Sequence, residues 1–109
     1  MNIILYNTTF AIEAPLEKEV MKWLEDEFIP SAIDDGYFLS TEKHRPSIFK
    51  VMCGESGQVT LAVHLYTSDT EIIDKWYADH GSRLFSNALE CWQGRVVFFS
   101  TTLHLIYEG

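Results

Sequence analysis

Strand-like and helix-like segments alternate along this chain in the order strand, helix, strand, strand, helix, strand. The four strand-like segments are residues 2–12, 37–45, 59–67 and 94–108. The first helix-like segment opens with Pro15 and has apolar residues at helical spacing: Leu16, Val20, Trp23, Leu24 and Phe28. The second helix-like segment follows residue 68. This order predicts two helices that connect the strands of one sheet.

The order leaves few topologies open, because β-α-β connections are right-handed. Two such crossovers put both helices on one face of a four-stranded antiparallel sheet with the strand order 4-1-3-2. A length of 109 residues fits one domain, and an apolar fraction of 47% can fill its core. We therefore predict a single α+β domain over residues 1–109 with the ferredoxin-like plait.

Charge and cysteine content argue against several classes of partner. A formal net charge of −8 argues against nucleic acid and anionic membranes, which both attract clusters of Lys and Arg. Cys53 and Cys91 lie far apart, which argues against a disulfide scaffold or a zinc ribbon. Residues 1–15 have no basic region and only a short apolar run, so they predict neither a signal peptide nor a membrane helix. We expect a cytoplasmic protein.

A proline interrupts the first helical pattern. Pro30 has no N–H to donate and its ring collides with the carbonyl one turn back, so the helix must kink or end near Phe28 or Ile29. Pro30 can also open a second short turn, with Gly36 as its left-handed C-terminal cap. The carboxylates around this break fall mostly on the solvated side: Glu25, Asp26, Glu27 and Asp34. That placement favours a structural role over acid–base catalysis.

The second helix is predicted to begin at a capping box formed by Ser68 and Glu71. Gly81 is a weak point within its buried stripe, which consists of Ile73, Trp76, Tyr77, His80, Leu84, Ala88 and Leu89. His80 and Arg83 lie one turn apart. They fit either the capture of an anion or, as the preferred interpretation, a tie to a neighbouring loop or subunit.

Alternation along the strands predicts which side chains the helices cover. We assign the uniformly apolar sets to the helix side: Ile3, Leu5, Val59, Leu61, Val63, Leu65, Val97, Phe99, Leu103 and Leu105. The alternate sets mix aromatic, hydroxyl and imidazole groups: Ile4, Tyr6, Phe10, Thr60, Ala62, His64, Tyr66, Val96, Phe98, Thr102, His104 and Ile106. The mixed face is too apolar for open solvent and too polar for a core. It predicts a homodimer packed through its sheets, a cavity, or both.

The mixed face is the best candidate for a site, with these ligand-binding candidates: Tyr6, Thr8, His64, Tyr66, Thr102 and His104. His64 and His104 are also the candidates for proton transfer. One strand separates them, so they lie about 10 Å apart, which argues against a shared metal ion. The simpler interpretation is that both histidines hydrogen-bond within a dimer interface. Arg45 could receive a carboxylate or phosphate, but a charge that protects a sheet edge is preferred. We predict no metal and no cofactor.

The chain carries, in this order, the motifs VMKWLEDEFIPSAIDDGYF, VTLAVHLYTSD, WYADHGSRLF and RVVFF. Together they resemble a small bacterial family known as domain of unknown function 4286. The matching positions are Trp23, Ile29, Pro30, Gly36, His80, Arg83 and Leu84. The chain departs at Phe28, where a histidine is usual, and at Gly81 and Ser82, where Ala-Pro is usual. The resemblance implies the fold and a cytoplasmic location but no reaction, and a catalytic histidine in the family would be missing here.

Three functions stay open. The first is a homodimeric small-molecule-binding domain with its site in a cleft between the sheet face and the first helix, lined by Tyr6, His64, Tyr66 and His104. The second is a small cofactor-independent enzyme, monooxygenase- or isomerase-like, in which His64 or His104 moves a proton. It follows from the likeness of the plait to dimeric α+β barrel proteins. The third is a purely structural interaction module. A water-filled cavity with converging polar groups would favour the first two.

Overall fold

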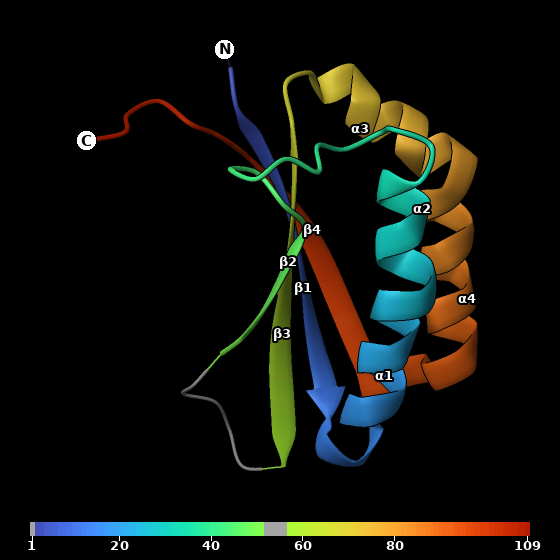
Figure 1. The fold of residues 1–109 in the computed structure, drawn as a ribbon. Helices are drawn as coiled ribbons and strands as arrows, with labels where there is room; N and C mark the ends of the chain where they lie inside the picture. The colour runs from blue at the N-terminus through green and yellow to red at the C-terminus, as the bar shows by residue number, and fades with distance from the viewer. Residues whose placement is uncertain (1, 52–56) are drawn as a thin grey trace.

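The computed structural model describes residues 2–51 and 57–109, and its elements follow the predicted order (Figure 1). The strands are β1 (Ile4–Glu13), β2 (Ser47–Lys50), β3 (Gln58–Thr67) and β4 (Val96–His104). They form one antiparallel sheet in the order β2-β3-β1-β4. The predicted strand order and the ferredoxin-like plait are therefore confirmed.

Two helical segments lie side by side on one face of this sheet (Figure 1). The first consists of η1 (Ala14–Leu16), α1 (Glu17–Trp23), the π-helical η2 (Leu24–Phe28) and α2 (Ile29–Ile33). The second consists of α3 (Thr70–Trp76), the π-helical η3 (Tyr77–Gly81), α4 (Ser82–Trp92) and the short turn η4 (Gln93–Arg95). None of the helices in the described ranges is long and apolar enough to cross a membrane.

Pro30 changes the hydrogen bonding of the first helical segment without ending it. The Ile29 N–H donates to the Leu24 carbonyl five residues back, which makes a π-helical turn directly before the proline. The helix continues to Ile33, and Gly36 follows with φ 79° and an N–H that donates to the Ile33 carbonyl. The glycine cap is confirmed, and a widened turn stands where the sequence predicted a kink or an end of the helix.

The second helical segment begins one residue later than predicted. Asp69, and not Ser68, is the cap, because its side chain accepts a hydrogen bond of 2.9 Å from the Glu71 N–H. Two residues of the predicted buried stripe, Tyr77 and Leu89, are exposed. They lie on the side of this segment that turns toward β4, next to a hollow described below.

Trp76 lies at the centre of the core, and its side chain explains why residue 81 of the second helical segment is a glycine. A Cβ at Gly81 would lie 2.7 Å from Cζ3 of Trp76, so the predicted weak point is a close contact that requires glycine. The Trp76 ring also packs edge-on against Tyr6, Phe28 and Phe38. Phe28 is fully buried among these rings, so the position where the family usually has a histidine serves packing here.

The second strand lies further along the chain than predicted. β2 begins at Ser47, after Pro46, so the predicted strand at residues 37–45 is wrong. Phe38 is buried instead, and its N–H donates to the Ala32 carbonyl at the end of the first helical segment. The backbone is thus hydrogen-bonded to the first helical segment at Phe38, before the chain enters β2. Cys53 and most of the predicted Gly-Glu-Ser-Gly turn lie outside the described residues.

The register assigns side chains to the two faces of the sheet. The face beneath the helices carries the buried residues Ile4, Tyr6, Thr8, Phe10, Ile12, Leu61, Val63, Leu65 and Val96. The predicted assignment is confirmed for β3 and wrong for β1 and β4, whose faces are exchanged. Both alternate sets of β1 start with apolar residues, Ile3 and Leu5 in one and Ile4 and Tyr6 in the other. Alternation therefore could not separate them.

Candidate functional site

The face of the sheet away from the helices, called the open face below, is unusually apolar. Its large hydrophobic side chains are between 46% and 63% exposed: Phe49, Val51, Val97, Phe99, Leu103 and Leu105. An antiparallel sheet with one solvated face normally carries polar side chains there. A contiguous apolar patch of this kind marks a surface that binds something.

A polar row crosses the middle of the open face. It consists of Ser47, His64, Asn7 and Thr101, which the register pairs side by side on the four strands. Burial lowers the pKa of His64, whose ring lies 4.8 Å from that of Phe49. The Oδ1 atom of Asn7 is buried and has no hydrogen-bond partner among the described residues. A buried acceptor without a donor costs free energy, so a donor from another molecule would stabilise this row.

A hollow of about 360 Å³, called the sheet pocket below, lies at one end of the open face. Its lining includes Tyr66, Leu5 and Leu103, which the register pairs in one row across three strands. His44 and His104 also line it, and the His44 ring lies 5.3 Å from the Tyr66 ring. The remaining lining residues are Ile3, Lys43, Leu105 and Glu108. The pocket thus combines an aliphatic surface with the rings of His44 and Tyr66.

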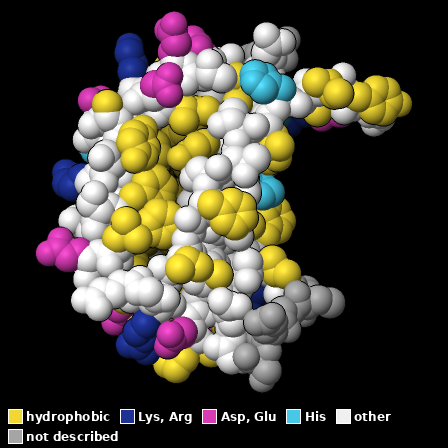
Figure 2. Space-filling model, turned by 180° about the vertical axis from the view of Figure 1, so that it is seen from behind, with side chains coloured by type: hydrophobic (Ala, Val, Ile, Leu, Met, Phe, Trp, Pro, Cys, Tyr) yellow, Lys and Arg dark blue, Asp and Glu magenta, His cyan; other side chains and the backbone are white. Residues whose placement is uncertain are grey.

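A second hollow of about 310 Å³, called the helix crevice below, lies on the other side of the sheet, between β4 and the second helical segment. Figure 2 views the molecule from behind and shows hydrophobic side chains gathered there, with charged side chains around the margin. None of the described residues that line this crevice is charged. Tyr6 and Ser100 are among them, so hydroxyl groups reach an otherwise apolar surface.

The structure divides the six predicted site residues between the two faces. His64 and Tyr66 lie on the open face, as predicted, whereas Tyr6 and Thr8 are buried beneath the helices. Thr102 pairs with Tyr6 and shares its side. The prediction of a single cleft between the sheet and the first helix that contains all of them is therefore wrong. The ligand-binding roles of these residues stay predictions.

Two smaller groups do stay together. Tyr66 and His104 both line the sheet pocket, and Tyr6 and Thr8 lie at or beside the helix crevice. Sequence reasoning missed His44, because its approach to Tyr66 depends on a turn in which the Thr41 N–H donates to the His44 carbonyl. The only sequence signal was the run of basic residues from 43 to 45.

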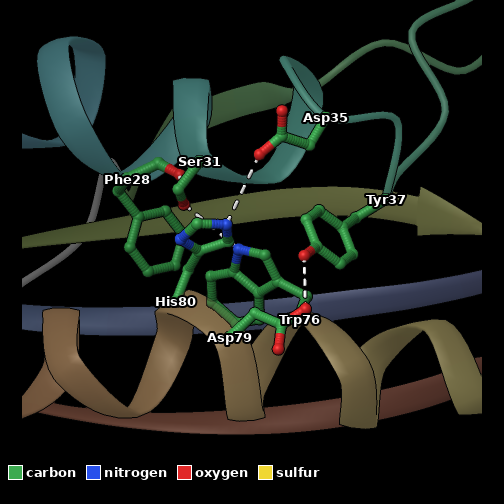
Figure 3. A network of polar contacts seen from close by, with 7 residues as sticks. All are labelled: Phe28, Ser31, Asp35, Tyr37, Trp76, Asp79 and His80. Atoms are coloured by element: carbon green, nitrogen blue, oxygen red, sulfur yellow. Dashed lines mark hydrogen bonds and ion pairs between the residues drawn. The ribbon is translucent and has the colours of Figure 1, made fainter.

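A chain of hydrogen bonds connects the two helical segments (Figure 3). The indole N–H of Trp76 donates to Oγ of Ser31 over 3.1 Å, and Ser31 donates to the Phe28 carbonyl over 2.6 Å. Ser31 follows Pro30 directly. Its hydroxyl donates to Phe28, the last residue of the widened turn, and also accepts the hydrogen bond of the buried indole. This contact holds the two segments in a fixed relation above the sheet.

His80 makes a second connection in the same region (Figure 3). Its Nε2 lies 3.6 Å from the carboxylate of Asp35, just beyond the end of α2, which matches the interpretation of His80 as a tie. The Tyr37 hydroxyl donates to Asp79 over 2.5 Å, and this bond raises the pKa of Tyr37 to about 12. Arg83 lines the groove beside His80, together with acidic residues, which is a poor setting for anion capture.

No cluster of three or more metal-binding side chains occurs within residues 2–51 and 57–109. Cys91 is a free, exposed thiol. His64 and His104 point to opposite sides of the sheet by register, because His64 pairs with Asn7 and His104 with Ile4. The two imidazoles therefore do not form one site. The absence of a metal and of a cofactor stays a prediction.

Two solved structures share the fold at low sequence identity. A dimeric ferredoxin-like protein from an uncultured marine organism is 12% identical, with 100% of both chains covered and a TM-score of 0.66. The de novo designed protein Foldit4 is 10% identical, with 93% of this chain and 96% of that chain covered and a TM-score of 0.58. No curated protein matches the sequence. The model of the family described as Domain of unknown function (DUF4286) matches residues 3–106, and the chain belongs to this family.

Proposed function

We propose that this protein is a homodimeric small-molecule-binding domain whose two copies pack through their open faces. The observation that carries the proposal is the set of half-exposed hydrophobic side chains on this face, with Phe99 63% exposed and Phe49 54% exposed. Removing apolar surface from water contributes about 25 cal/mol per Å². A second copy offers the same surface, and a two-fold axis lets each copy cover the other.

The polar row supports the same arrangement. Asn7 needs a donor for its Oδ1 atom, and His64 and Thr101 lie in the same row. In a face-to-face dimer the equivalent row of the second copy crosses this one and can supply that donor. The solved dimeric ferredoxin-like protein shows that a chain with this fold can form a dimer.

The sheet pocket is the proposed ligand site. It lies at the end of the open face, so a second copy would close it and remove its ligand from water. Leu5 and Leu103 would contact the apolar part of a small molecule, and His44 and Tyr66 would donate or accept hydrogen bonds. The proposed location in the cytoplasm follows from the sequence and stays a prediction.

A cofactor-independent enzyme is the second candidate, and the state of His64 favours it. Because burial lowers the pKa of His64, its imidazole is neutral near pH 7 and can accept a proton. In this alternative the reaction would take place against the polar row of the open face, inside the dimer. A measured pKa of His64 that shifts further when a retained ligand is removed would favour this candidate over simple binding.

Native mass spectrometry of the protein, purified gently from its own host, tests the proposal. We expect a dimer that carries a small molecule, which the same instrument can release and identify. The His44→Ala variant is the matched control, since His44 lines the sheet pocket but lies outside the strands of the open face, so the variant should lose the ligand and keep the dimer. An empty dimer would favour a purely structural interaction module, and a monomer would contradict the proposed assembly.

A further inference from the structure

Buried hydroxyl groups mark the helix side of the sheet. Within the described residues, the buried polar side chains are Thr8 and Thr67, 1% and 2% exposed. Thr67 has a structural role, because its Oγ1 accepts a hydrogen bond from the Asp69 N–H at the start of α3. Thr8 has no such role: its Oγ1 lies 2.9 Å from Oγ of Ser100 on the neighbouring strand.

Tyr6 brings a third hydroxyl to the same place. It is 6% exposed and neighbours Thr8 on the same face of β1. Burial raises the pKa of Tyr6, and hydrogen bonding to Ser100 and Thr8 opposes that shift. Tyr6 and Ser100 line the helix crevice, so this cluster of hydroxyls faces a hollow and not only the core.

The walls of the crevice are mostly aromatic and aliphatic, with Ser82 and Ser86 of α4 beside them. The rings of Phe85 and Phe98 stack with centroids 4.9 Å apart, and Tyr77 lies beside Phe85 at 6.1 Å. Tyr77 and Leu89 are 47% and 54% exposed, although neighbouring exposed positions of the same segment carry charges. An uncharged crevice in a chain with a net charge of −8 disfavours ionic ligands and admits neutral ones.

We propose that the helix crevice is a second binding site, which takes a neutral planar aromatic molecule with one hydroxyl or carbonyl group. The ring system would lie against Phe98 and Leu89, and the polar group would exchange hydrogen bonds with Ser100 and Tyr6. The crevice lies beside the edge strand β4, shares Phe99 with the open face, and has no lining residue in common with the sheet pocket, so it is a site separate from that pocket.

Three probes of one shape test the proposal by NMR titration of the full chain. They are 2-naphthol, naphthalene and 2-naphthoate, which differ only in the group on the ring. We expect 2-naphthol to shift the backbone amide signals of Tyr6, Phe98 and Ser100 in a saturable way. Naphthalene should bind about three- to tenfold more weakly, which is the usual value of one hydrogen bond. 2-Naphthoate should be weaker still, because its charge would lose water.

Two variants and a control locate the site. Ser100→Ala removes the hydroxyl that pairs with Thr8 beside the crevice and should reduce 2-naphthol affinity about three- to tenfold, while leaving naphthalene affinity unchanged. Leu89→Lys should weaken both probes, since it adds a charge to the wall. Leu103→Lys, in the sheet pocket, should change neither. Shifts outside the crevice, equal affinity for 2-naphthoate, or an unchanged affinity in Ser100→Ala would each overturn the proposal.

Discussion

Both faces of the sheet carry large apolar side chains, but their surroundings are opposite. On the helix side, Val63 and Leu65 are 0% and 1% exposed, because two helical segments cover them. On the open face, Phe99 and Leu103 are 63% and 49% exposed, and no described part of the chain covers them. The comparison shows that one layer of helices can bury only one face of a four-stranded sheet. The composition of the second face therefore points to cover from a second molecule.

The two faces also differ in whether their polar groups have hydrogen-bond partners. The helix side holds hydroxyls that are paired with each other, as in Thr8 and Ser100. The open face holds Asn7, whose Oδ1 atom is buried without a partner within the described chain. The hydroxyls beneath the helices thus have partners within the chain, whereas Asn7 on the open face lacks a donor. Substitutions on the helix side should therefore change folding, and substitutions on the open face should change assembly.

The largest effect is expected from Trp76→Ala on the covered side. Removing a fully buried indole leaves a cavity, which should lower the free energy of unfolding by about 3–5 kcal/mol. Urea denaturation followed by circular dichroism measures this value. Tyr77→Ala, at the exposed neighbouring position, is the control and should cost much less. Equal losses in both variants would mean that the core is not organised around Trp76.

The next effect concerns assembly and the open face. Phe99→Lys should raise the dimer dissociation constant about thirtyfold or more, since it places a charge in an apolar interface. Light scattering after size exclusion measures the mass, and circular dichroism checks that the monomer stays folded. Leu89→Lys alters an equally exposed leucine on the helix side and should leave the dimer intact. If Leu89→Lys dissociates the dimer and Phe99→Lys does not, the interface lies elsewhere.

A smaller loss of stability is expected from Ser31→Ala. The variant leaves the buried indole N–H of Trp76 without its acceptor, so the free energy of unfolding should fall by about 1–3 kcal/mol. Ser86→Ala in α4 serves as the control, because Ser86 is exposed. A loss no larger than in Ser86→Ala would show that Ser31 does not connect the two helical segments.

The pKa of His64 should show whether the open face is covered or lies in solvent. Its folded-state pKa is lowered by burial, so the folded protein favours the neutral imidazole. The stability from this group is therefore present above the unfolded pKa of about 6.5 and is lost as the pH falls below it. NMR titration of the imidazole signals should give a pKa below 6.5 for His64, and lower in the dimer than in Phe99→Lys. A pKa at or above that value would place His64 in open solvent.

The smallest expected effect concerns the pKa of Tyr37, whose hydroxyl donates to Asp79. Spectrophotometric titration should show one tyrosine, Tyr37, with a pKa of about 12. In Asp79→Asn the hydrogen-bonded carboxylate is lost, and this pKa should return toward the usual value of about 10. Asp74→Asn, on the same helical segment, should leave the titration unchanged. A normal pKa in the unmodified chain would show that the Tyr37–Asp79 bond does not form in solution.

The order of elements could be predicted from the sequence because the residues that start and end its helices act locally. Pro15 and Pro30 mark helix starts, Gly36 adopts the left-handed conformation of a cap, and the apolar periodicity marks both helices. These features depend on residues within one or two turns of each other. The strand order then follows from the handedness of two crossovers.

The faces of the strands and the site depend on contacts between distant segments. The sequence prediction places Thr8 on the uncovered face together with Tyr6, yet it is buried beneath the helices, where its hydroxyl pairs with that of Ser100, 92 residues away. Phe38 reads as part of a strand, but the end of α2 holds its backbone. Local alternation therefore could not divide the six predicted site residues correctly between two faces.

Sedimentation equilibrium of the unmodified protein over a range of micromolar concentrations tests the cover of the open face most directly. We predict a monomer–dimer equilibrium in which the dimer predominates, with the Phe99→Lys variant monomeric under the same conditions. A protein that stays monomeric at every concentration, with Phe99 and Leu103 still in solvent, would contradict the conclusion that a second copy covers the open face.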